Sequence, residues 1–158
     1  MKIFYKQIFV ILVLGLIPYG CDNDPASPQE EHIDADGFIL EDENGIEIYR
    51  EFEGASSGSI TVSVGDTLEL SVHFLDHDGN KIEHEEGEEV DSDEEDELRI
   101  SGNDSSIVIV EVEVEEHQEI GIHVIGVSSG STSFKLELMH GDHADYTSTN
   151  FVPVTVNE

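Results

Sequence analysis

The sequence predicts an all-β protein whose strands form a sandwich of two antiparallel sheets. From residue 37 onward, short segments of alternating apolar and polar residues recur between glycine-rich turns. None of these segments shows the period of about 3.6 residues that marks an amphipathic helix. Alternation with a period of two is typical of strands with one buried face, and many short strands at this spacing favour a sandwich.

The first two expected strands form an extra N-terminal hairpin. Their sequences are GFILED and IEIYREF, at residues 37–42 and 46–52, and Asn44-Gly45 lies between them. Asn-Gly between alternating segments is the strongest short-range signal of a β-hairpin. We therefore expect the sandwich domain, residues 37–158, to begin with this hairpin.

The remaining expected strands follow in two groups, separated by an acidic segment at residues 83–97. Clustered like charges repel one another, so we expect this segment to be a flexible loop. The strands are expected at residues 59–64, 67–75, 98–101, 106–116, 119–127, 132–139 and 151–156.

Residues 1–20 have the features of a secretory signal peptide. Lys2 and Lys6 precede an apolar run, Ile8–Ile17, which is half the length of about 20 residues that a membrane-spanning helix needs. Gly20-Cys21 at its end resembles a bacterial lipoprotein signal, which implies cleavage before Cys21 and lipid attachment to this sole cysteine. The alternative is a plain signal peptide with an incidental cysteine. Residues 21–36, with two prolines, are expected to be a tether, and the domain would be held at the membrane in the cell envelope.

The chain is strongly acidic. It has 37 acidic and six basic residues, and two of the basic residues lie in the leader, so the processed chain has a formal charge of 4 − 37 = −33. Such a surface repels nucleic acid, which we exclude as a partner. Adaptation to a salty medium and capture of cations both fit this charge, and its spread along the chain favours the first.

Several motifs resemble those of bacterial immunoglobulin-like domains of the group 2 type. The segment Val64–Leu70 matches the Val-Gly-Asp-x-x-x-Leu opening of that family, and Gly126 followed by Ser128-Ser129-Gly130 matches a strand end and small-residue turn. The likeness covers roughly residues 59–156. It implies an immunoglobulin-like sandwich and a spacer or binding scaffold, and it implies no particular activity.

The eight histidines are the feature that most invites a functional hypothesis. Strand alternation directs His73 and His123 outward. The resemblance implies that their strands are antiparallel neighbours, so we expect the two histidines to form a cross-strand pair.

Further histidines lie in loops that the resemblance places at one pole of the sandwich. Gly141 permits a sharp turn that brings His143 back beside His140, and Asp142 or Asp145 is expected to accept a ring N–H. The leading hypothesis is a zinc or copper site formed by His73, His123, His140 and His143, with His77 and His117 as substitutes. Its alternative is that these are ordinary solvated histidines.

A calcium site at Asp76–Asn80 is the weaker interpretation. Acidic residues at alternate positions followed by glycine occur in calcium loops, but Gly87 stands where the closing glutamate belongs. A tight turn at Asp78-Gly79 explains the segment more simply.

The sequence contains no nucleophile elbow and no phosphate-binding loop, so we expect a protein without enzymatic activity. The main functional hypothesis is an envelope lipoprotein that binds zinc or copper, with another envelope protein as a further partner. The alternative is a structural or adhesive surface module without metal. Tyr49, Tyr146 and Phe151 are its candidate contact residues.

Overall fold

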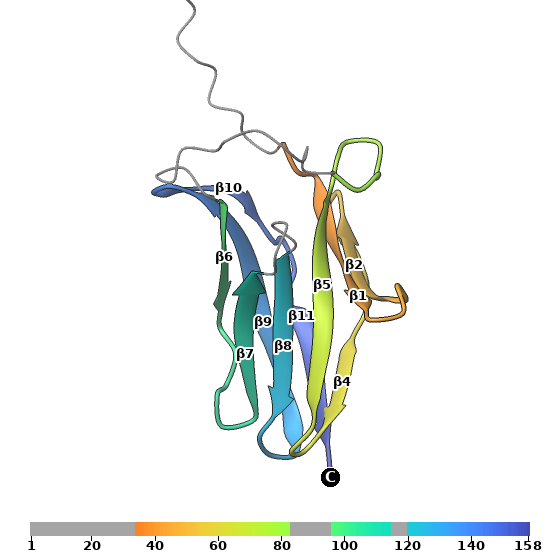
Figure 1. Cartoon of the computed structure of the whole chain (residues 1–158), viewed down its shortest axis with the longest axis vertical. Helices are drawn as coiled ribbons and strands as arrows, with labels where there is room; N and C mark the ends of the chain where they lie inside the picture. The colour runs from red at the N-terminus through yellow and green to blue at the C-terminus, as the bar shows by residue number, and fades with distance from the viewer. Residues whose placement is uncertain (1–33, 83–95, 115–119) are drawn as a thin grey trace, which may run out of the picture. The chain divides into compact units, whose positions relative to one another are not determined.

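The computed structural model describes residues 34–82, 96–114 and 120–158, all within the compact unit His32–Glu158. These residues form β-strands and no helix, which confirms the all-β prediction (Figure 1). Accordingly, they include no helix long and apolar enough to cross a membrane. The expected leader, the tether up to residue 33 and most of the acidic loop lie outside the described residues.

One sheet has six strands in the order β3-β2-β1-β5-β8-β7, and every neighbouring pair is antiparallel. The expected hairpin, β1 and β2, is an integral part of this sheet because β1 also pairs with β5. The strands are β1 (Gly37–Asp42), β2 (Glu47–Phe52), β3 (Ala55–Gly58), β5 (Thr67–Leu75), β7 (Val108–Val114) and β8 (Ile120–Gly126).

The second sheet has five strands and is organised by the long strand β9. The first half of β9 pairs with β11, and its second half pairs with β6 and β10. The pair β11–β4 is parallel, so the expectation of purely antiparallel sheets fails at this one pair. The strands are β4 (Ile60–Ser63), β6 (Asp96–Ser101), β9 (Gly130–His140), β10 (His143–Thr147) and β11 (Val152–Asn157).

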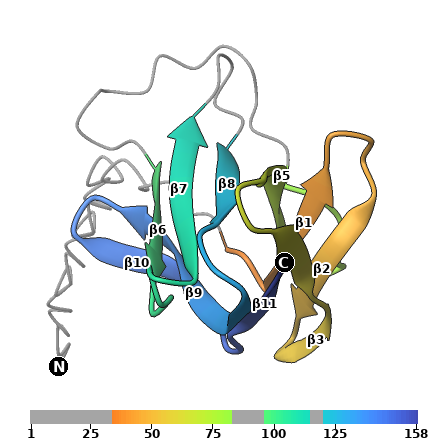
Figure 2. The same cartoon turned by 90° about the horizontal axis from the view of Figure 1, so that it is seen from below.

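The two sheets form the expected immunoglobulin-like sandwich. The order β1-β5-β8-β7 faces β6-β9-β11, which is the arrangement of four strands against three in such domains (Figure 2). As expected, β5 and β8 are antiparallel neighbours.

Two short strands, β3 and β10, were not expected. The acidic loop ends before residue 97, because Asp96 and Glu97 pair with His140 and Met139 of β9.

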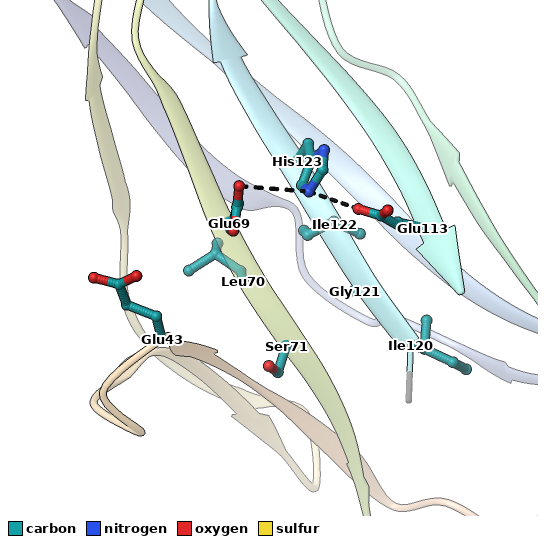
Figure 3. Close-up of a pocket in the computed structure, with 9 residues that line it drawn as sticks. All are labelled: Glu43, Glu69, Leu70, Ser71, Glu113, Ile120, Gly121, Ile122 and His123. Carbon is teal, nitrogen blue, oxygen red and sulfur yellow. Dashed lines mark ion pairs between the residues drawn. The ribbon is translucent and has the colours of Figure 1, made fainter. Parts of the chain in front are cut away.

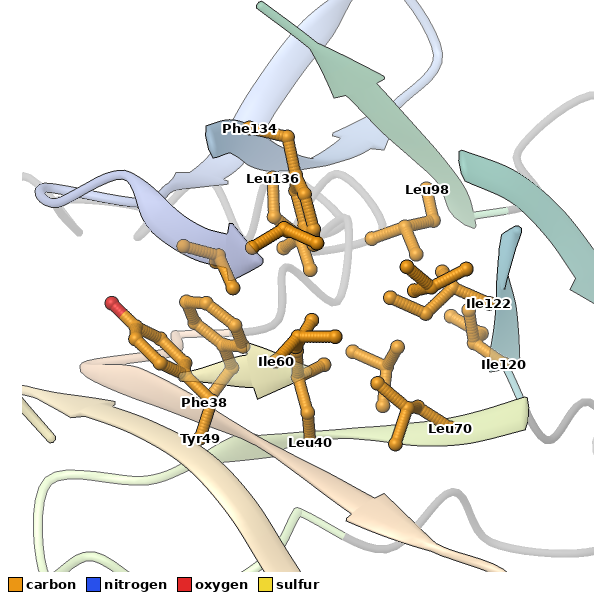
Figure 4. Packing of buried hydrophobic residues seen from close by; sticks show 14 of the residues in the cluster. Phe38, Leu40, Tyr49, Ile60, Leu70, Leu98, Ile120, Ile122, Phe134 and Leu136 are labelled. Atoms are coloured by element: carbon orange, nitrogen blue, oxygen red, sulfur yellow. The ribbon is translucent and has the colours of Figure 1, made fainter. Parts of the chain in front are cut away.

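The core consists of side chains that alternate inward from both sheets (Figure 4). Phe38, Leu40 and Leu70 of the six-stranded sheet and Phe134 and Leu136 of the other are almost completely buried. Burial of each such side chain contributes about 1.5–3 kcal/mol. The apolar face of each sheet is therefore covered by the other, which leaves the outer faces to carry function.

Gly126 marks a close approach between the two sheets at the end of β8. A Cβ atom there would lie 2.2 Å from the backbone oxygen of Ser63, the last residue of β4. The backbone of Gly126 also exchanges hydrogen bonds with the turn after β4, since its oxygen accepts from Gly65 and its N–H donates to Asp66. Only glycine fits without displacing this backbone.

Candidate functional site

The β9–β10 hairpin brings His140 and His143 together, as the sequence predicted. The two residues are Cα partners in the antiparallel ladder, and their ring centroids lie 5.7 Å apart. Gly141 adopts a φ of 57°, the left-handed conformation that a two-residue hairpin turn requires. Local turn geometry therefore places two imidazoles side by side at the tip of the hairpin.

Two carboxylates flank His143, in agreement with the expected role of Asp142 and Asp145. The Nε2 atom of His143 lies 3.2 Å from Oδ1 of Asp145, whose side chain is only 4% exposed. The Nδ1 atom lies 3.7 Å from Oδ1 of the fully exposed Asp142. The buried Asp145 carboxylate is thus placed to orient the ring of His143.

His73 lies on the outer face of the six-stranded sheet, as its strand alternation predicted. Its Nε2 atom is 3.5 Å from Oε2 of Glu41 on β1. The same oxygen accepts a 2.7 Å hydrogen bond from Lys81, so Glu41 bridges two basic groups. These contacts form a small charged cluster at the β1–β5 boundary.

His123 also faces outward, but it contacts a different set of carboxylates. Its Nε2 atom lies 2.8 Å from Oε2 of Glu113 on β7 and 4.0 Å from Oε1 of Glu69 on β5 (Figure 3). Together with Glu43 from the β1–β2 turn, these side chains line a shallow surface hollow. In this hollow the imidazole of His123 lies between the carboxylates of Glu69 and Glu113.

The expected cross-strand pairing of His73 with His123 is wrong. The strands are neighbours as expected, but the ladder places Glu69, not His73, opposite His123. His73 lies four residues further along β5 (73 − 69 = 4), which is about 13 Å at about 3.3 Å per residue. Two imidazoles at that separation cannot share one ion.

The structure therefore brings together only two of the four histidines of the leading hypothesis, His140 and His143. His73 and His123 lie apart on the six-stranded sheet, and His140 and His143 lie on the other sheet. In the part of the chain that the structure describes, no group of three or more His, Cys, Asp or Glu side chains is placed to hold a metal ion. His77 is exposed beside Asp78, and His117 falls outside the described residues.

The segment Asp76–Asn80 forms a tight turn, and the carboxylate of Asp76 accepts hydrogen bonds from the backbone of that turn. Its Oδ1 accepts 2.9 Å hydrogen bonds from the backbone N–H groups of Asp78 and Asn80. The bond from Asn80 is the main reason that the pKa of Asp76 is held below its ordinary value. Asp42 plays the same part in the β1–β2 turn, where it accepts from Asn44 and Ile46. This geometry favours the turn interpretation over the calcium interpretation.

The pattern of residues does not predict that the carboxylate of Glu51 is buried. This carboxylate accepts hydrogen bonds from the hydroxyl of Tyr146 and from the backbone N–H groups of Thr149 and Asn150. Burial is the main cause that raises the pKa of Tyr146, and the hydrogen bond to Glu51 adds to it. Tyr49 and Tyr146, expected as contact residues, instead pack in the core, and only Phe151 of the three is exposed.

No known protein family matches the chain, and no curated protein matches it. Solved structures with some likeness are domains of the S-layer protein SbsC. Domains 4 and 5 have a TM-score of 0.42 and 16% sequence identity, and the match covers 77% of each chain. Domains 5–6 have a TM-score of 0.40 and 22% identity, with 63% of this chain and 40% of that chain covered. Likeness at this level carries no functional conclusion.

Proposed function

We propose that this chain is a non-catalytic, immunoglobulin-like module of the bacterial cell surface that acts through contact with another envelope protein. The leader, residues 1–20, followed directly by Cys21, supports export and attachment of a lipid to Cys21. The sandwich fold supports a rigid module, because its core is filled by apolar side chains from both sheets. Contact must therefore involve its outer faces or sheet edges.

The observation that carries this proposal is the edge strand β7. Among the described strands it pairs only with β8. Asp104 and Asn103 hydrogen-bond the backbone of Val108, and beyond that residue the other side of the strand is not paired with a described strand. Such an edge is a template on which an extended segment of a partner adds a strand. Ile109 and Val112 of β7 are each 38% exposed and provide apolar contacts on its two sides.

The charge of β7 defines the chemistry of the partner. Glu111 and Glu113 are exposed and alternate with the aliphatic residues of the strand. A second copy of this acidic chain would be repelled, whereas an extended segment with alternating basic and apolar residues would be attracted. The proposed partner is therefore a basic strand of another envelope protein.

The binding experiment uses the processed domain and a synthetic peptide of alternating lysine and valine as the probe, with amide chemical shifts as the readout. We expect shifts concentrated on β7 and lost in Val112→Lys. The matched control is Val127→Lys in the β8–β9 turn, where the valine is 40% exposed, and it should bind normally. Shifts spread evenly over all acidic surfaces, or equal loss in both variants, would overturn the proposal.

A further inference from the structure

The tip of the β9–β10 hairpin is a feature that protein contact at β7 does not use. Its two imidazoles come from opposite strands and face each other at a ring-centroid distance of 5.7 Å, with an angle of 60° between the ring planes. The outer-face histidines have no such arrangement, because the strand register separates His73 from His123. We propose that His140 and His143 chelate one first-row transition-metal ion at this tip.

The distance between the rings fits shared coordination. With metal–nitrogen distances of about 2.0–2.1 Å and a tetrahedral angle, the centroids of two imidazoles on one ion lie about 5 Å apart. The observed 5.7 Å exceeds that value by less than about 1 Å. The hairpin thus holds the two rings at nearly the separation that a shared ion requires.

The backbone and a buried carboxylate restrict the pair further. The ladder fixes His140 opposite His143, and the turn between them contains only Gly141 and Asp142. The carboxylate of Asp145 lies 3.2 Å from Nε2 of His143, and that of the exposed Asp142 lies 3.7 Å from Nδ1. In the proposed site the ion replaces the longer contact, at Nδ1, while Asp145 continues to orient the ring. A carboxylate behind a ligating histidine is the usual arrangement around metal sites.

The two imidazole ligands indicate which class of metal ion the site binds. Imidazole suits copper, nickel and zinc, and nitrogen donors bind Cu²⁺ most tightly in the first-row series. Within the described residues, the proposed chelate takes two ligands from the protein, the imidazoles of His140 and His143.

The test is titration of the processed domain with Cu²⁺ and, separately, with Zn²⁺ in the presence of excess glycine, which competes for loosely held ions. We expect one saturable equivalent of each ion, and an electron paramagnetic resonance spectrum of the copper form with splitting from two imidazole nitrogens. His140→Ala/His143→Ala should lose this equivalent, while Asp145→Asn should bind about 10–100-fold more weakly.

The matched control is His77→Ala, which removes an exposed histidine outside the hairpin and should leave binding unchanged. His140→Gln/His143→Gln replaces the alanine variant if melting curves show that the latter unfolds. The proposal would be overturned if saturable binding survived the loss of both histidines, or if the His77 variant lost binding to the same extent. It would also be overturned if the ions bound only weakly and without saturation, as they would to scattered carboxylates. Tighter saturable binding of Ca²⁺ than of Cu²⁺ would also overturn it.

Discussion

The buried carboxylate of Glu51 on β2 accepts a 2.8 Å hydrogen bond from the hydroxyl of Tyr146 on β10. The backbone N–H groups of Thr149 and Asn150 donate to the same carboxylate at 2.6 and 2.8 Å. Because β2 and β10 belong to different sheets, this one side chain ties the N-terminal hairpin to the opposite layer of the sandwich.

Replacement of Glu51 by alanine should destabilise the domain strongly. Hydrogen bonds to a charged group contribute about 1.5–3 kcal/mol each, and the variant leaves several donors without their acceptor, so we expect a loss of about 3 kcal/mol or more in the free energy of unfolding. The exposed Glu47 on the same strand is the control, and Glu47→Ala should change stability by less than about 0.5 kcal/mol. Similar urea midpoints for the two variants would contradict the role of Glu51.

Stability should fall in alkaline solution because of Tyr146. Burial raises the pKa of this tyrosine above its ordinary value of 10.0. The folded state keeps the proton that the unfolded chain releases, so stability is complete below about pH 10 and is lost as the pH rises further. Urea unfolding between pH 8 and pH 11 should show a shallower decline for Tyr146→Phe than for the unchanged chain. Parallel declines would show that another group is responsible.

Two glycines of β8 should respond differently to alanine. At Gly126 the added Cβ meets the backbone oxygen of Ser63 at 2.2 Å, so we expect a loss of about 1–3 kcal/mol as the backbone shifts. At Gly121 the nearest atom lies at 3.6 Å, an ordinary contact, and alanine should be tolerated. Thermal melts of both variants provide the measurement, and an equal effect at the two positions would refute the close approach at Gly126.

The strand register can be measured by double-mutant cycles. His123 and Glu113 are 2.8 Å apart on neighbouring strands, and we expect a coupling energy of about 0.2–1 kcal/mol at a pH where the imidazole is protonated. The pair His73 and His123 should show no coupling, because the register separates them. Coupling between the two histidines and none between His123 and Glu113 would require a different register.

Added salt should stabilise the domain. A formal charge of −33 on the processed chain produces self-repulsion, and screening at about 1 M salt reduces the range of that repulsion to about 3 Å. We expect the melting temperature to rise steadily with sodium chloride. Sodium chloride and potassium chloride should act alike if screening is the cause, whereas a large difference between them would indicate specific ion binding.

Much of the fold follows from local patterns in the sequence. The alternation in residues 67–75 predicts β5, which has one buried face, and the Asn44-Gly45 turn predicts the end of β1, whose residues 37–40 are all buried. The turn at Gly141 likewise places His143 beside His140, because a two-residue loop leaves one register. These outcomes depend on residues that are close along the chain.

The sequence could not place the residues whose position depends on distant partners. Alternation fixes the face that His123 occupies, but a slip of two or four residues keeps that face, so the pattern could not decide between His73 and Glu69 as its neighbour. The aliphatic residues Ile46, just before β2, and Ile48, within it, alternate with Tyr49 and Glu51 of that strand. The chain buries Tyr49 and Glu51, because Tyr146 and the β10–β11 turn donate hydrogen bonds to the carboxylate of Glu51.

The central claim is that the module contacts a basic strand through β7, and photo-crosslinking on intact cells tests it most directly. A photoreactive amino acid at Ile109 should yield an adduct that mass spectrometry maps to a lysine- or arginine-rich extended segment of an envelope protein. The same group at Val127, which is similarly exposed but lies in a turn, should yield none. Absence of an adduct at Ile109, or the same adduct from both positions, would contradict the account.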